Sequence, residues 1–143
     1  MNFICPFTHG LNRKRLIMAV LAVFAFIFLS NWLIHGVWLK SAYEATASLW
    51  RSQEDMHNYC KWMMLGQFLS TAFLVIIFAR GYQGKGVSEG GKFALLMVPF
   101  LMGRIFMTYS YTPISASLMW CWVCAESLQV LIASYLAAAI YKH

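Results

Sequence analysis

The sequence predicts an all-α polytopic membrane protein, a bundle of four transmembrane helices in which residues 1–143 form one domain. Hydrophobic residues make up 61% of the chain and charged residues 11%, whereas soluble domains contain about 25% charged residues. The apolar residues are gathered in four segments long enough for helices that cross a bilayer, each of which needs about 20 residues. The loops between these segments are too short to form a soluble catalytic domain.

The four predicted spans cover about residues 16–39, 62–79, 93–111 and 118–140. Their continuity favours helices, because the strands of a membrane barrel are segments of about 10 residues with alternating apolar and polar side chains. The basic stretch at residues 13–15 before the first span resembles the start of a signal peptide. The following apolar run is longer than the usual h-region of about 7–15 residues, and no A-x-A site follows it, so we expect a retained helix.

The connection between the first two spans is expected to be helical. Residues 40–51 contain mostly good helix formers and no glycine or proline, so we expect the first helix to continue to about Trp50. Ser52 followed by Asp55 resembles a capping box, which predicts that the second helix starts near Gln53. The first and second helices would then extend beyond the membrane as a hairpin.

The other two connections are short. Residues 81–92, GYQGKGVSEGGK, are rich in glycine but lack the spacing of a phosphate-binding loop and a preceding strand, so they predict a flexible, basic turn. Thr112 followed by Pro113 is typical of a helix start, with Thr112 as the N-cap and Pro113 in the first turn. We therefore expect the last helix to begin there.

Lysine and arginine residues indicate the orientation of the chain. One side of the predicted spans carries Arg13, Lys14, Arg15, Arg80, Lys85, Lys92 and Lys142. The other side carries Lys40, Arg51 and Lys61. Because cytoplasmic loops are enriched in these residues, both termini are expected on the cytoplasmic side of a bacterial cytoplasmic (inner) membrane. No basic patch interleaved with aromatic residues indicates a nucleic-acid partner.

Polar residues inside the spans predict a buried polar layer in the outer half of the bundle. Charged residues within a span are costly and usually face a partner or water. Arg104 and Glu126 lie at similar depths in the third and fourth spans, so we expect them to form an ion pair. Other polar residues lie three or four positions apart, a spacing that places them on one helix face. The predicted layer consists of Asn31, His35, Gln67, Arg104, Glu126 and Gln129.

Two interpretations of this layer remain open. The side chains form interhelical hydrogen bonds that set the order of the helices, or they line a pocket for a polar head group, a quinone or a proton path. His35 could ligate a tetrapyrrole, but a single histidine is more often a hydrogen-bonded interface residue. No metal site is predicted, because a zinc site needs about four suitably placed ligands.

Two further patterns concern packing. The tryptophans all fall in the outer half or just outside it, at Trp32, Trp38, Trp50, Trp62, Trp120 and Trp122. They form an interfacial belt, or they line an outward pocket or contact a partner. Small residues repeat four positions apart at Ala133 and Ala137, and at Ser134 and Ala138. This spacing predicts close helix packing at the cytoplasmic end, within the bundle or against another subunit.

Cys121 and Cys124 form a C-x-x-C motif in the last span and are the candidate redox residues. A redox C-x-x-C usually lies at a helix N-terminus, whereas Cys121 is expected more than two turns inside its helix. The order and side of the two cysteines resemble those of vitamin K epoxide reductases and their bacterial relatives, which are four-helix membrane bundles. The resemblance implies thiol–quinone exchange, but the first loop offers only Cys60 where that family has a pair.

Three segments are similar to those of small uncharacterised bacterial membrane proteins with four predicted helices. They are NWLIHG at residues 31–36, ARGYQGKGVSEGGKFALL at residues 79–96 and AAAIYK at residues 137–142. This resemblance implies a fold and a topology, and it implies no activity.

The sequence shows no nucleophile–base pair, so we expect a non-enzymatic accessory or structural subunit of a larger membrane complex. Its expected partners are membrane lipids and other membrane protein subunits, with a quinone, lipid or tetrapyrrole contact in the outer half. The alternatives are a thiol–quinone oxidoreductase that uses Cys121 and Cys124, and an oligomer that transports a small molecule or an ion.

Overall fold

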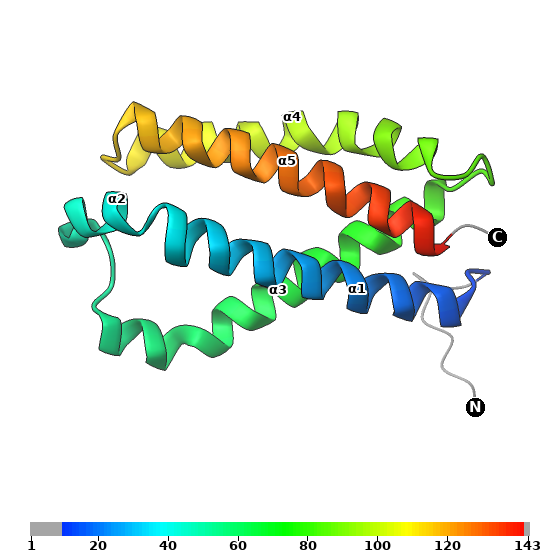
Figure 1. The fold of residues 1–143 in the computed structure, drawn as a ribbon, viewed down its shortest axis with the longest axis horizontal. Helices are drawn as coiled ribbons and strands as arrows, with labels where there is room; N and C mark the ends of the chain where they lie inside the picture. The colour runs from blue at the N-terminus through cyan, green and yellow to red at the C-terminus, as the bar shows by residue number, and fades with distance from the viewer. Residues whose placement is uncertain (1–9, 142–143) are drawn as a thin grey trace.

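The computed structural model describes residues 10–141, and these residues form helices and connecting turns without a strand (Figure 1). In chain order the elements are α1 (Arg13–Asn31), a π-helix (Trp32–Trp38), α2 (Lys40–Ala45), a 3-10 turn (Ala47–Leu49), α3 (Gln53–Gly81), α4 (Ser88–Tyr111) and α5 (Ala116–Tyr141). The first helix with its π-helical extension, α3, α4 and α5 are each long and apolar enough to cross a membrane. The prediction of an all-α fold with four helices of this kind is confirmed.

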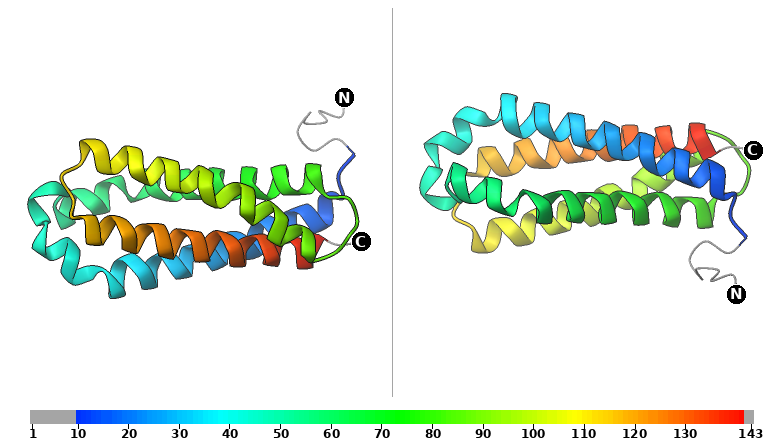
Figure 2. Two further views of the ribbon diagram at one scale, coloured as in Figure 1. Left: turned by 90° about the horizontal axis from the view of Figure 1, so that it is seen from above. Right: turned by 90° about the horizontal axis from the view of Figure 1, so that it is seen from below.

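The four long helices form an elongated antiparallel bundle (Figures 1 and 2). α5 packs along both α4 and α1, and α1 also packs against α3. The start of α1, the α3–α4 connection and the end of α5 lie at one end of the bundle (Figure 1). The π-helix, α2, the start of α3 and the α4–α5 connection lie at the other end.

Charge and tryptophan distinguish these two ends. We call the first the basic end, because it carries Arg13, Lys14, Arg15, Arg80, Lys85 and Lys92. We call the second the tryptophan end, because the half of the bundle on that side carries Trp32, Trp38, Trp50, Trp62, Trp120 and Trp122. Six described basic residues thus lie at the end opposite the tryptophans, whereas Lys40, Arg51 and Lys61 lie at the tryptophan end.

The helix starts follow from side chains that bind free backbone N–H groups. Ser52 Oγ accepts a hydrogen bond from the Asp55 N–H at 3.1 Å, so α3 begins where the sequence predicts. The predicted start of the last helix is wrong, because Ser115 Oγ accepts the Leu118 N–H at 3.2 Å and α5 begins at Ala116. Thr112 instead has an extended backbone and ends α4. Each cap satisfies an N–H group that the first helical turn leaves unpaired.

The first helix does not run unbroken to Trp50 as predicted. The N–H of Leu39 donates to the carbonyl of Ile34, five residues earlier, at 2.8 Å, which defines the wide turn of a π-helix. The helix is interrupted again at Thr46, whose hydroxyl donates to a backbone carbonyl one turn earlier at 2.8 Å. Such side-chain bonds compete with regular helical structure.

A carboxylate organises the α3–α4 connection, which the sequence predicts to be a flexible turn. Glu89 accepts the N–H of Gln83 at 2.7 Å and the N–H of Lys85 at 2.5 Å. Gly84 and Gly86 have φ angles of +82° and +81°, a backbone conformation that glycine adopts without steric cost. The Glu89 carboxylate is therefore hydrogen-bonded to backbone N–H groups of the α3–α4 connection.

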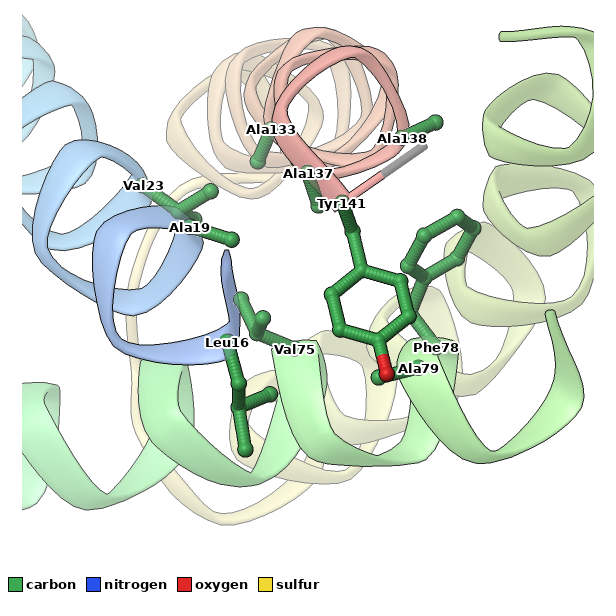
Figure 3. Close-up of a cluster of buried hydrophobic side chains, with 10 residues drawn as sticks. All are labelled: Leu16, Ala19, Val23, Val75, Phe78, Ala79, Ala133, Ala137, Ala138 and Tyr141. Carbon is green, nitrogen blue, oxygen red and sulfur yellow. The ribbon is translucent and has the colours of Figure 1, made fainter. Parts of the chain in front are cut away.

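One apolar core lies in the half of the bundle nearer the basic end. Figure 3 shows side chains from α1, α3 and α5 that point toward one another. The buried members are Leu16, Ala19, Val23, Val75, Phe78, Ala79, Ala133, Ala137, Ala138 and Tyr141. The predicted close packing of small residues in the last helix is confirmed, since Ala133 and Ala138 are fully buried and Ala137 is 1% exposed. A second cluster of buried side chains lies toward the tryptophan end and consists of Leu39, Ile105, Ile114, Leu118, Met119 and Val123.

α4 approaches α5 closely at Gly90. A Cβ atom at this position would lie 2.6 Å from the Ser134 carbonyl oxygen, closer than real Cβ contacts. Glycine on α4 and small residues on α5 therefore let the two backbones pack closely, as small residues do between membrane helices.

Candidate functional site

Gln129 on α5 is the centre of a polar cluster between α1, α3 and α5. Its Nε2 donates to Ser30 Oγ at 2.6 Å and to Asn31 Oδ1 at 2.9 Å, and the Ile27 carbonyl lies 3.4 Å away. Asn31 Nδ2 in turn donates to Gln67 Oε1 on α3 at 3.5 Å. The structure thus brings together Asn31, Gln67 and Gln129, three residues of the predicted layer. Ser30 was not predicted, although it precedes Asn31 in the sequence.

Two polar atoms beside this cluster have no partner in the described part of the chain. They are Nε2 of Gln67 and Oγ1 of Thr71, which lie one turn apart on α3 and are buried. An unsatisfied buried donor or acceptor costs about 1–3 kcal/mol, and such groups in proteins usually bind ordered water. The cluster therefore offers free hydrogen-bonding capacity in the interior of the bundle.

His35 belongs to a second group, separate from the cluster around Gln129. Its Nδ1 lies 2.6 Å from the Tyr43 hydroxyl, which accepts the Nε1–H of Trp122 at 2.8 Å. The Tyr43 hydroxyl and His35 Nδ1 share one hydrogen bond, and the tautomer of the His35 ring decides which of the two groups donates. The wide π-helical turn sets the angular register between His35 and Tyr43 that makes this contact. Because a regular helix is expected here from the sequence, Tyr43 is not among the predicted site residues.

Burial keeps the Tyr43 hydroxyl protonated. Removal from water raises the pKa of the Tyr43 phenol, and the negative charge of Glu126 also raises it, whereas the hydrogen bond from Trp122 acts in the opposite direction. A phenol with a raised pKa keeps its hydrogen at physiological pH. Tyr43 therefore connects Trp122 to His35 through one hydroxyl group.

Aromatic rings pack around Tyr43. The ring centroids of Tyr43 and Trp50 are 5.4 Å apart, and those of Trp50 and Trp122 are 6.2 Å apart. Trp50 Nε1 also donates to Thr46 Oγ1 at 2.9 Å. Two of the six tryptophans thus lie inside the tryptophan end, and the other four, Trp32, Trp38, Trp62 and Trp120, are exposed on its surface. The four exposed tryptophans fit an interfacial belt. Trp50 and Trp122, which lie inside, do not fit that interpretation.

The expected ion pair between Arg104 and Glu126 is wrong. Among residues 10–141 the direct ion pair joins Lys40 and Glu44 at 3.8 Å. Arg104 is exposed on α4 and does not belong to the buried layer. Glu126 is partly buried on α5, and the two charges attract each other only at longer range. Arg104 and Glu126 lie at similar depths in their helices, but the rotation of α4 about its own axis directs Arg104 outward.

Glu126 lies on the α5 face that joins the two polar groups. Trp122, Glu126 and Gln129 are four and three residues apart, so they form one stripe along the helix. No hydrogen bond to the Glu126 carboxylate forms within the described residues, so this acid is open to a proton, water or a ligand. Toward the basic end the stripe meets the apolar core at Ala133.

Of the two C-x-x-C cysteines, Cys121 packs in the same apolar cluster as Tyr43 and Trp122, whereas Cys124 does not belong to it. Cys121 is half-buried, Cys124 is exposed, and both are free thiols, as is Cys60 on α3. Since α5 begins at Ala116, Cys121 lies in the second turn, nearer the helix start than predicted. Within residues 10–141 no group of three or more His, Cys, Asp or Glu side chains is placed to hold a metal ion.

Comparison with known proteins gives no match for this chain, whether with family models, curated proteins or solved structures. The resemblances to small bacterial membrane proteins and to vitamin K epoxide reductases therefore stay predictions.

Proposed function

We propose that this chain is a non-enzymatic integral membrane protein and an accessory or structural subunit of a larger complex in a bacterial cytoplasmic membrane. The observation that carries the proposal is Arg104, which is exposed on the surface of an apolar helix. It lies seven residues before the end of α4, which corresponds to about 10 Å along the axis. A charged side chain in a span is costly unless a partner or water compensates it.

The direct neighbours of Arg104 within the chain do not supply that compensation. Glu126 is the nearby acid, and it forms no direct ion pair with Arg104 in the described part of the protein. An acidic or carbonyl-rich surface on a transmembrane helix of another subunit would pair with the guanidinium. The subunit interface is therefore proposed to include the exposed face of α4 around Arg104.

α3 supports the same proposal from another side of the bundle. None of residues 54–70 is buried, whereas Thr71, Val75, Phe78 and Ala79 in the second part of the helix are. The first part of α3 presents apolar side chains such as Trp62 that lipid or a further helix would cover.

The distribution of charge supports an orientation with the basic end in the cytoplasm. The one described acid at that end, Glu89, is bound to backbone N–H groups. At the tryptophan end, three basic residues are accompanied by Glu44, Glu54 and Asp55. The positive-inside rule then places both termini in the cytoplasm. The extension of the tryptophan end beyond the membrane as a hairpin belongs to the same proposal.

The apolar core favours a subunit over a transporter. Val23, Val75 and Ala133 are fully buried between α1, α3 and α5, on the basic-end side of the polar cluster. A polar solute or ion that entered at the tryptophan end would meet this packed layer, where burial without partners is strongly unfavourable. The packed layer thus blocks a polar path along the axis of a single bundle.

Native mass spectrometry of the protein extracted from membranes in mild detergent tests the subunit proposal. Wild type is expected in a stoichiometric complex, and Arg104→Leu is expected to lower the complex fraction by roughly tenfold or more, as expected for an intramembrane charge contact. Arg104→Lys keeps the charge, and Lys61→Leu removes a charge elsewhere, so both should retain most of the complex. A monomer at every detergent concentration would contradict the proposal, and so would an intact complex in Arg104→Leu.

A further inference from the structure

A groove of about 430 Å³ lies on the surface between α4 and α5. Its lining residues are Ala94, Leu95, Val98, Pro99, Ser127, Leu128 and Leu131. All of them except Ser127 are apolar. In a protein placed in a membrane, as proposed above, such a surface accepts an apolar chain.

On α4 the groove leads to a lysine. Lys92, Leu95 and Pro99 are three and four residues apart and therefore share one face of the helix. Lys92 is exposed and lies in the second turn of α4, at the basic end. Its ammonium group forms no ion pair within the described residues. The apolar groove thus has an available cation one turn beyond Leu95.

On α5 the groove leads to a hydroxyl group. Tyr135, Leu131 and Leu128 share a face in the same way. A Cβ atom at Gly91 would lie 2.6 Å from the Tyr135 hydroxyl oxygen, which places this hydroxyl against α4 next to Lys92 in the sequence. Tyr135 is 42% exposed, so the residue lies at the surface of the bundle. The basic-end mouth of the groove therefore offers an ammonium and a phenol hydroxyl as hydrogen-bond donors.

The surroundings of this mouth favour an anion. The basic residues described at this end are Arg13, Lys14, Arg15, Arg80, Lys85 and Lys92. Glu89, the acid described there, has its two oxygens bound to the N–H groups of Gln83 and Lys85. Basic clusters beside membrane helices attract anionic lipids, with about 1 kcal/mol for each lysine or arginine near the surface.

We propose that this groove binds an anionic phospholipid. Lys92 Nζ and the Tyr135 hydroxyl donate hydrogen bonds to the phosphate, and one acyl chain lies along the groove between α4 and α5. A second copy of this chain in the same orientation would bring its own basic end beside Lys92, and the like charges would repel each other. Charge complementarity therefore selects the lipid over a second copy as the occupant.

Native mass spectrometry of the full chain in detergent, titrated with phosphatidylglycerol or phosphatidylcholine of identical acyl chains, tests this site. Wild type is expected to bind phosphatidylglycerol more tightly than phosphatidylcholine. Lys92→Gln should weaken phosphatidylglycerol binding about fivefold, and Leu131→Trp, which fills the groove, should weaken binding of both lipids. Lys85→Gln is the matched control, because it removes a charge at the same end from a lysine bonded to Gln83 Oε1 at 2.6 Å, outside the groove.

Several results would overturn the site. Equal losses in Lys92→Gln and Lys85→Gln would show a diffuse electrostatic effect, and equal binding of the two lipids by wild type would show that the headgroup is not recognised. Unchanged binding in a Leu131→Trp variant with a wild-type circular dichroism spectrum would exclude the groove, and a dimer abolished by that substitution would identify a second copy as the occupant. These outcomes are independent of the Arg104 variants, so the lipid site and the subunit role can fail separately.

Discussion

The two halves of the bundle hold the same helices together in different ways. Near the basic end, α1, α3 and α5 meet through side chains such as Val23, Val75 and Ala133, which have no exposed surface. Near the tryptophan end, hydrogen bonds around Gln129 join α5 to α1, and Trp122 of α5 donates to Tyr43 of α2. This half also contains an apolar cluster, with Leu39, Ile105 and Val123 among its buried members. Directional polar contacts between helices are thus added to apolar packing in the tryptophan-end half.

The two halves differ in how far hydrogen bonds contribute to the contacts between their helices. Lipid is as apolar as the helix surfaces, so close packing of small residues is an important source of association between membrane helices. The basic-end half is packed in this way, and Ser134 Oγ is buried there without a partner in the described residues. Gln67 Nε2 and Thr71 Oγ1 are buried without partners beside the Gln129 cluster. The two halves therefore differ in the hydrogen bonds between helices, which the Gln129 cluster supplies.

The largest expected effect comes from breaking the packed half at Gly90. In Gly90→Ala the new Cβ would lie 2.6 Å from the Ser134 carbonyl oxygen and 3.0 Å from Tyr135 Cα, both backbone atoms. We expect a loss of about 1–3 kcal/mol in the free energy of unfolding, the usual cost of overpacking. Chemical denaturation in detergent micelles, followed by circular dichroism, measures it.

Gly103→Ala is the matched control for Gly90→Ala. It lies in the same helix, and a Cβ there would have no heavy atom within 4 Å. Alanine is the better helix former by about 1 kcal/mol, so Gly103→Ala should leave stability unchanged or raise it. Equal destabilisation by the two substitutions would show that α4 and α5 do not pack closely at Gly90.

A smaller effect is expected when the polar half is broken at its centre. Asn31→Ala and Gln129→Ala each remove one partner of the 2.9 Å hydrogen bond between α1 and α5. A double-mutant cycle should give a coupling energy of about 0.6–1.7 kcal/mol, the range for hydrogen bonds between membrane helices. Additive effects of the two substitutions would mean that the residues do not interact.

The smallest expected effect concerns the contact between His35 and Trp122. Tyr43→Phe keeps the ring packing but removes the hydroxyl that links the two side chains. We expect a loss of about 0.5–1.5 kcal/mol and a change in Trp122 fluorescence as its N–H loses a partner. Tyr111→Phe serves as the control, because Tyr111 is 74% exposed at the same end. A Tyr43→Phe protein that matches Tyr111→Phe in both measurements would contradict the hydrogen-bonded link.

Helix depth could be predicted well from the sequence, whereas helix rotation could not. The sequence predicts Asn31, Gln67 and Gln129 in one polar layer in the outer half, and they do form a connected cluster. Arg104 and Glu126 are predicted at similar depths in their spans, but Arg104 is exposed. In a helix that is apolar on nearly all sides, the hydrophobic pattern does not indicate which face turns inward.

The sequence by itself determined the number of long helices, their order and the separation of basic residues from tryptophans. These properties depend on local composition and on the length of helix that about 20 apolar residues form. Only the tertiary structure decided that a π-helix brings His35 to Tyr43, that Arg104 lies outside the polar layer, and that a groove between α4 and α5 leads to Lys92 and Tyr135. Those outcomes depend on the angular register of each helix and on contacts between residues far apart in the chain, which composition and spacing do not encode.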